Sequence, residues 1–259
     1  MSGRARTDVL GYSVTALTAS ELGEDVIQAI LIGRKRSFLA CLNPHSFVEA
    51  QKALIVRDAL KSATWLIPDG VGIVIASHLL GGAVAGRVTG WDVFLALNSR
   101  LNEAGGSVFF IGSTPEVLKA VVERFSRDYP NVRIVGSISP SFATEIAAQE
   151  NREILQVISD ASPDLLWVAM TAPRQEKWIF RNRNNLEVGV AGAIGAVFDF
   201  YAGTRPRAPA VWRNLGLEWG YRLLRNPARM WRRTFISAPL FLWAVLKHLC
   251  HSIRSRDMK

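Results

Sequence analysis

Short apolar runs alternate with amphipathic stretches over the first 200 residues. Six mostly apolar runs predict strands, at residues 37–42, 64–67, 107–111, 132–135, 164–169 and 187–191. Helical spacing of apolar positions between them predicts helices over residues 44–61, 91–103, 143–159 and 173–184, with two more beginning after Gly70 and at Pro115. Apolar strands separated by helices are typical of a parallel sheet covered on both faces. The sequence therefore predicts an α/β fold with a mainly parallel, Rossmann-like sheet.

Polar residues and glycines follow several of these strands, where ligands bind in such sheets. The positions are Asn43, Asp69, Gly112 and residues 171–175. Asp69 lies on a glycine-flanked turn, where a carboxylate can act as a general base or can simply cap the next helix. The spacing alone favours the cap. Gly112 lies just before a helix N-terminus, which suits a phosphate. Every strand-to-helix connection in such a fold offers the same feature, so it is not specific to Gly112.

The pattern changes after Gly203. One face of a predicted helix carries four apolar residues, Trp212, Leu215, Trp219 and Leu223. Asn226-Pro227 interrupts this helix, and a second amphipathic helix follows. We therefore divide the chain into an α/β domain, residues 1–203, and a helical appendage, residues 204–259.

The charge is divided at the same place. Residues 1–199 hold 19 Lys and Arg against 20 Asp and Glu, whereas residues 200–259 hold 12 against 2. Arginine and tryptophan on amphipathic helices suit an anionic membrane surface. A helical pair packed on the sheet, with solvated arginines, explains the composition equally well. The longest apolar stretch, residues 235–250, is short of the roughly 20 residues that span a bilayer, and no secretory signal follows Met1. We expect a cytoplasmic protein whose C-terminal region lies on the inner face of the cell membrane.

Several catalytic motifs are missing. The chain has no DxD triplet, HExxH, GxSxG or GxxxxGK[ST] sequence, and its four histidines share no metal-ligand spacing. Cys41 and Cys250 belong to no CxxC pair. Metal hydrolases, P-loop NTPases and α/β-hydrolases therefore lose support, and the residues alone indicate an α/β ligand-binding protein.

An ordered set of motifs resembles the WecG/TagA/CpsF family of bacterial glycosyltransferases. The motifs are Asn43-Pro44, Pro68-Asp69-Gly70-Val71-Gly72, Arg87-Val88-Thr89-Gly90-Trp91-Asp92, Ala172-Pro173-Arg174-Gln175-Glu176-Lys177-Trp178, Phe198-Asp199-Phe200-Tyr201-Ala202-Gly203, Arg207-Ala208-Pro209 and Gly216-Leu217-Glu218-Trp219-Gly220-Tyr221-Arg222-Leu223. The resemblance covers about residues 8–250. It implies transfer, with inversion, of N-acetylmannosamine, its uronic acid, glucose or a similar sugar from a UDP-sugar to a polyprenyl-diphosphate-linked saccharide. It also implies teichoic acid-like or exopolysaccharide biosynthesis, peripheral membrane attachment and self-association.

The resemblance also assigns residues to roles. The general base falls on Asp69, which would take the proton of the acceptor hydroxyl. The diphosphate-binding arginines fall on Arg222, Arg229 and Arg232, which can bind phosphate oxygens without a metal, so we expect no cofactor. Expected donor-binding residues are Cys41, Asn43, Gly70, Arg87, Gly90, Asp92, Gly112, Gln175, Glu176 and Gly192. Cys41 replaces a threonine of the family pattern, and His45 stands where an acidic residue is common.

Two alternatives remain open from the sequence. An NAD-dependent nucleotide-sugar oxidoreductase or epimerase would explain the Rossmann-like alternation, although the GxGxxG fingerprint is missing. A nucleic-acid-binding module would explain the basic tail, although the tail carries no recognised nucleic-acid motif. We expect no nucleic-acid partner.

Overall fold

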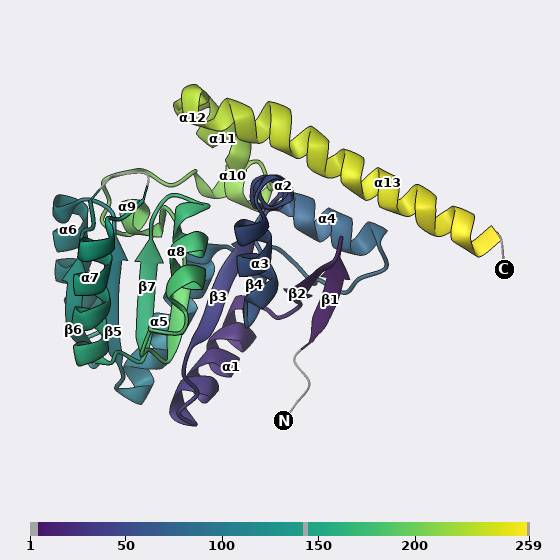
Figure 1. Ribbon diagram of the computed structural model, residues 1–259. Helices are drawn as coiled ribbons and strands as arrows, with labels where there is room; N and C mark the ends of the chain where they lie inside the picture. The colour runs from purple at the N-terminus through teal and green to yellow at the C-terminus, as the bar shows by residue number, and fades with distance from the viewer. Residues whose placement is uncertain (1–4, 142–144, 258–259) are drawn as a thin grey trace.

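The computed structural model describes residues 5–141 and 145–257, with the side chains of Asn214, Arg229 and residues 252–257 excepted. Within this part of the chain, the main sheet has six parallel strands in the order β4-β3-β8-β7-β5-β6 (Figure 1). The strands are β3 (Ser37–Leu42), β4 (Trp65–Pro68), β5 (Ser107–Gly112), β6 (Arg133–Ile138), β7 (Leu165–Ala169) and β8 (Val190–Ala193). The predicted α/β fold with a parallel sheet is confirmed.

Helices cover both faces of the sheet, so alternate residues of each strand enter two cores. Leu39 and Cys41 of β3 point into one core, whereas Phe38, Ala40 and Leu42 point into the other. The first core contains α1 (Ala19–Leu31), α5 (Gly90–Ala104), α6 (Pro115–Asp128) and α9 (Val197–Tyr201). The second contains α2 (Pro44–Lys52), α3 (Leu54–Ser62), α7 (Ala148–Ala161) and α8 (Arg174–Asn182). Burial on both sides explains why the strands are continuously apolar.

Several element boundaries differ from the prediction. An antiparallel hairpin of β1 (Arg6–Val9) and β2 (Tyr12–Thr15) and helix α1 precede the first predicted strand. The helix predicted over residues 44–61 is two helices, because Ala53 is extended at their junction. β8 begins three residues later than predicted, since Glu187 lies at the surface beside Lys35 and Arg36. Helix α7 begins at Ala148, and residues 143 and 144 of its prediction lie outside the described residues.

The C-terminal helices pack on the carboxyl edge of the sheet. They are α10 (Ala210–Asn214), α11 (Glu218–Arg225), α12 (Pro227–Arg232), the π-helical segment η1 (Arg233–Ser237) and α13 (Ala238–Asp257). The prediction of a single helix before Asn226 is wrong, because this segment forms α10 and α11. Gly216, at φ 72°, separates α10 from α11 and packs against Val71 of α4 (Val71–Leu79). The shared face predicted for the four apolar residues is therefore divided between two helices.

Helix α13 crosses above the sheet edge and continues past the body of the molecule (Figure 1). Phe241 and Val245 on one side of it are buried in the core with α2, and the Phe241 and Phe47 ring centroids are 5.2 Å apart. Trp243 on another side is 66% exposed. Among the described residues, no helix has the length and apolar character needed to cross a bilayer.

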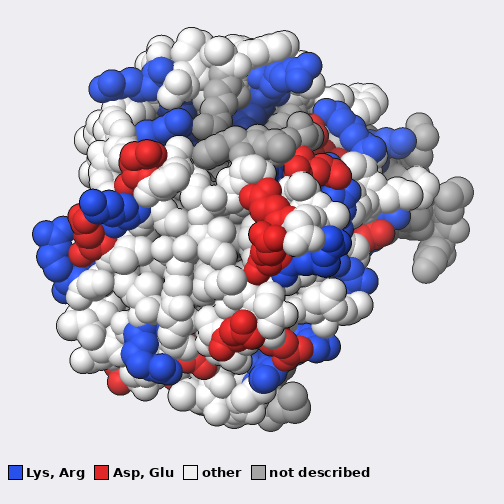
Figure 2. Space-filling model, turned by 60° about the vertical axis from the view of Figure 1, so that its left-hand side comes forward, with Lys and Arg blue, Asp and Glu red and all other residues white. Residues whose placement is uncertain are grey.

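Charged side chains of the sheet region are mixed in sign. Figure 2 shows acidic and basic groups side by side on the face turned toward the viewer. Many form exposed ion pairs, such as Arg124 with Asp128 at 3.1 Å and Arg181 with Glu145 at 2.9 Å. This face therefore presents no single-sign patch, in keeping with the balanced charge of residues 1–199.

Candidate active site

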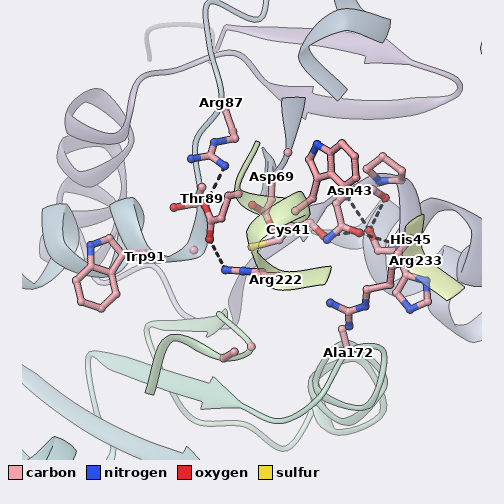
Figure 3. Close-up of a pocket in the computed structure, with 18 of the residues that line it drawn as sticks. Cys41, Asn43, His45, Asp69, Arg87, Thr89, Trp91, Ala172, Arg222 and Arg233 are labelled. Carbon is pink, nitrogen blue, oxygen red and sulfur yellow. Dashed lines mark hydrogen bonds and ion pairs between the residues drawn. The ribbon is translucent and has the colours of Figure 1, made fainter. Parts of the chain in front are cut away.

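A cavity of about 440 Å³ lies where the carboxyl ends of β3, β4 and β8 meet the C-terminal helices. Its floor comes from the loops that follow these strands, and its cover comes from α11, α12 and η1. The predicted residues that line it are Cys41, Asn43, Asp69, Gly70, Arg87, Gly90, Gln175, Glu176 and Arg222. Segments more than 180 positions apart in sequence thus form one site (Figure 3).

Asp69 follows β4, and its backbone N–H donates to the carbonyl of Leu42 at 2.8 Å. Gly70 is next, at φ 110°, a conformation that favours glycine. Gly70 is also the N-cap of α4, and no side chain caps that helix, so the interpretation of Asp69 as a helix cap is wrong. Its half-buried carboxyl faces the cavity instead.

The environment of Asp69 adjusts its basicity. Burial raises the pKa of its carboxyl above the ordinary value, and the nearby Glu218 raises it further. Arg222, Arg87 and a hydrogen bond from Asn43 oppose this rise. A carboxylate with a raised pKa holds a transferred proton more readily than an exposed one does.

Helix α2 begins at the cavity with a capping box. The Asn43 side chain accepts from the Ser46 N–H at 2.9 Å, and the Ser46 hydroxyl accepts from the Asn43 N–H at 2.8 Å. This arrangement fixes the Asn43 side chain beside Asp69. His45, two residues after Asn43, shares a 3.0 Å hydrogen bond with the buried Ser237 hydroxyl of η1, and burial lowers its pKa.

Cys41 is a buried wall of the cavity. Its Sγ donates to the Ala193 carbonyl at 3.6 Å. Burial raises the pKa of the thiol well above its ordinary value, and Asp69 and Glu176 add to this. The protonated thiol is a poor nucleophile, so the geometry favours a structural position.

Gln175 and Glu176 at the start of α8 are both buried. The Gln175 carbonyl oxygen accepts from the Gly195 N–H at 2.9 Å, and its amide donates to Glu176 at 2.9 Å. Burial raises the pKa of Glu176, whereas Gln175 and Arg233 lower it. The pair joins α8 to the loop after β8 and shapes that wall of the cavity.

Arginines from both parts of the chain reach the cavity. Arg87 and Arg222 bind the two oxygens of the Glu218 carboxylate, which the dashed lines in Figure 3 mark. The Arg207 guanidinium lies 4.6 Å from the centroid of the Trp91 ring. In Figure 3, Trp91 lies at one side of the site, and Arg233 lies with His45 at the other.

Sequence reasoning missed three of these charged residues as site residues: Arg207, Glu218 and Arg233. Arg207 and Glu218 belong to motifs that resemble the family, so a search for charged residues within those motifs would have found them. Arg233 belongs to no quoted motif. No sequence signal separates it from its neighbour Arg232.

Other predicted site residues lie outside the cavity. Asp92 closes the capping box of α5, where its carboxylate accepts from the Thr89 N–H at 3.0 Å and hydroxyl at 2.7 Å. A Cβ on Gly192 would lie 2.4 Å from the Trp167 ring, and one on Gly112 would lie 2.4 Å from the Ala169 carbonyl oxygen. The structure therefore gives these three residues packing or capping roles.

Two appendage arginines also stand apart. Arg232 is exposed, with its guanidinium 5.6 Å from the Trp231 ring. Arg229 belongs to α12, but its side chain lies outside the described residues. Among the described residues, no group of three or more His, Cys, Asp or Glu side chains is arranged to hold a metal ion.

Nearly the whole chain matches the model of one protein family. The model of the glycosyl transferase WecG/TagA/CpsF family matches residues 7–255. The chain belongs to this family. The resemblance drawn from the motifs is thereby confirmed, and the chain is a glycosyltransferase. The oxidoreductase and nucleic-acid-binding alternatives lose their support.

Three curated relatives share the name N-acetylglucosaminyldiphosphoundecaprenol N-acetyl-beta-D-mannosaminyltransferase. The relative from Bacillus spizizenii is 36% identical over 83% of this chain and 80% of its own length. That from Bacillus subtilis is 34% identical over 81% and 78%. That from Staphylococcus aureus strain MW2 is 28% identical over 95% and 94%.

Proposed function

We propose that this glycosyltransferase moves an N-acetylhexosaminyl group, of the N-acetylmannosamine type, from a UDP-sugar to a polyprenyl-diphosphate-linked saccharide, with inversion. The observation that carries the proposal is the place of Asp69, whose carboxyl faces the cavity between Asn43 and the arginines Arg87 and Arg222. The names of the relatives support the transferred sugar and the undecaprenyl-diphosphate acceptor.

The chemistry requires a base and a cluster of positive charge. In a single displacement, Asp69 takes the proton of the acceptor hydroxyl as that oxygen attacks the anomeric carbon. Negative charge then develops on the departing UDP. Arg222, Arg87, Arg207 and Arg233 all line the cavity and can stabilise this charge by charge-assisted hydrogen bonds. We propose that these guanidiniums serve without a metal ion, so that transfer persists in excess chelator.

The base assignment is tested with Asp69→Asn, which keeps the shape of the side chain and removes its basicity. UDP release is measured with a polyprenyl-diphosphate N-acetylglucosamine acceptor and a panel of UDP-sugars. We expect kcat to fall by about 10²–10⁴ and UDP binding to remain. Turnover near that of the wild type would refute the role of Asp69. Asp58→Asn, at an exposed position of α3, is the matched control.

We also propose peripheral attachment to an anionic membrane through α13. Its exposed apolar side chains include Leu242, Trp243 and Leu246, which are 53%, 66% and 47% exposed. Tryptophan at such a position suits the headgroup region. Flotation with vesicles containing anionic lipid tests this, with neutral vesicles and duplex DNA as comparisons. Binding to DNA alone would overturn the membrane proposal. Self-association stays a prediction.

A further inference from the structure

Glu218 is a buried carboxylate in a cavity that the proposed function assigns to anionic substrates. Its side chain is 7% exposed. Oε2 accepts from Nη1 of Arg87 at 3.1 Å, and Oε1 accepts from Nη2 of Arg222. Both oxygens are therefore engaged, each by a different guanidinium. A buried carboxylate with two arginine partners requires an explanation, because taking a carboxylate out of water is costly.

The two arginines come from different parts of the fold. Arg87 belongs to the loop between α4 and α5, whereas Arg222 lies one turn after Glu218 on α11. The Glu218 carboxylate thus joins the C-terminal helices to the sheet region at the cavity. Gly216, just before α11, lies beside Val71, and a Cβ added to it would meet the Val71 side chain at 3.6 Å.

The contact leaves most of the arginine donors available. Each guanidinium has five N–H groups, and Glu218 accepts from one nitrogen of each. The Phe200 ring further orients Arg222, whose guanidinium carbon lies 5.1 Å from its centroid. Without a carboxylate between them, two guanidiniums that face one cavity repel each other. With it, they are held in a fixed pair whose remaining donors can meet phosphate oxygens.

We propose that Glu218 is a positioning residue that holds Arg87 and Arg222 together as the binding pair for a diphosphate. The inference rests on the proposed function, since it names a residue that prepares the same site. The diphosphate belongs either to the nucleotide or to the lipid-linked acceptor. Glu218 touches neither and acts through the arginines.

The first test measures binding without turnover. Glu218→Gln keeps the shape but replaces one acceptor oxygen by an NH2 group, which cannot accept from a guanidinium, so it can satisfy only one arginine. The full-length protein is titrated separately with UDP and with a short-chain polyprenyl diphosphate. We expect the affinity for one of these probes to fall at least about fivefold, which identifies the source of the diphosphate. Unchanged affinity for both would overturn the inference.

Glu187→Gln is the matched control. Glu187 also joins two basic side chains, Lys35 and Arg36, but lies before β8, outside the cavity. Its substitution is expected to leave both affinities within about twofold of the wild type. An equal loss in this variant would show a general effect of removing carboxylates and would overturn the inference.

A double-mutant cycle tests action through Arg222. Glu218→Gln, Arg222→Gln and the double variant are compared by kcat/KM for UDP release. If Glu218 acts through Arg222, the combined loss falls short of the product of the two single losses by at least about threefold. A double variant whose loss of kcat/KM equals the product of the two single losses would refute action of Glu218 through Arg222.

The pH profile separates positioning from a structural role. Asp69 is surrounded by Arg222, Arg87, Asn43 and Glu218, with Cys41 nearby. Glu218→Gln removes a charge that raises the pKa of Asp69 and releases an arginine that lowers it, so we expect the acidic limb of kcat/KM to move in this variant. A lower active fraction alone would reduce the amplitude and leave the limb in place, and that result would overturn the inference.

Glu218→Asp guards against misfolding of the amide variant. The shorter side chain keeps the charge but cannot reach both guanidiniums, so we expect weaker diphosphate binding. We also expect the acidic limb to move to higher pH, because a released arginine no longer lowers the pKa of Asp69. The proposed function is refuted by a different result from the one that refutes the positioning role of Glu218. A wild-type protein that binds diphosphate but transfers no sugar would refute the transfer reaction and leave the positioning role intact.

Discussion

Phe241 provides a direct test of how firmly the C-terminal helices are attached. Its ring is 4% exposed, meets Phe47 edge-on and packs near Gly72. Replacing a buried phenylalanine by alanine costs about 3–5 kcal/mol, from lost transfer free energy and the residual cavity. Phe241 lies on an outer helix that can partly collapse into the gap, so we expect about 3 kcal/mol for Phe241→Ala. At about 2–4 °C per kcal/mol for a chain of this size, the melting temperature falls by about 6–12 °C.

The assay is urea and thermal unfolding followed by circular dichroism, with limited proteolysis to detect release of α13. Trp243→Ala is the control on the same helix, because its side chain is 66% exposed. Surface substitutions of this kind stay within about 0.5 kcal/mol. A Phe241→Ala protein as stable and as protease-resistant as Trp243→Ala would refute the packing of α13 against α2.

Three further outcomes follow from the burial of individual residues. Burial raises the pKa of Asp69, so the stability that this group contributes is lost as the pH rises through its folded-state pKa. The Asp69→Asn variant should therefore melt slightly above the wild type at pH 7. A lower melting temperature would contradict this. Gly192→Ala places a Cβ against the Trp167 ring and should lower the free energy of unfolding by about 1–3 kcal/mol in urea. A thiol reagent should modify the exposed Cys250 in the native protein and reach the buried, protonated Cys41 only after unfolding; rapid labelling of both would refute the burial of Cys41.

The hydrophobic pattern predicted the sheet well, because strands buried on both faces are continuously apolar. It failed where tertiary contacts decide the boundary. Ala53, a good helix former, is extended between α2 and α3, where no glycine or proline marks a break. The β1–β2 hairpin is short, and its residues gave no clear alternation before the turn at Gly11.

The site was predictable to the extent that its residues follow strands. Asn43 and Asp69 line the cavity because the carboxyl ends of neighbouring parallel strands meet at one edge. The arginines were harder to predict. Arg232 and Arg233 are adjacent in sequence but about 100° apart around a helix, so only the orientation of the helix on the sheet decides which one faces the cavity.

The cover of the cavity has a consequence for synthesis of the protein. The sheet ends at Ala193, yet Arg222, Met230 and Arg233 complete the cavity wall from the chain that follows. During translation the floor is therefore made first, and the cavity exists only after the final helices have emerged and docked. A nascent chain or a fragment cut after the sheet therefore presents an open edge in place of a closed cavity.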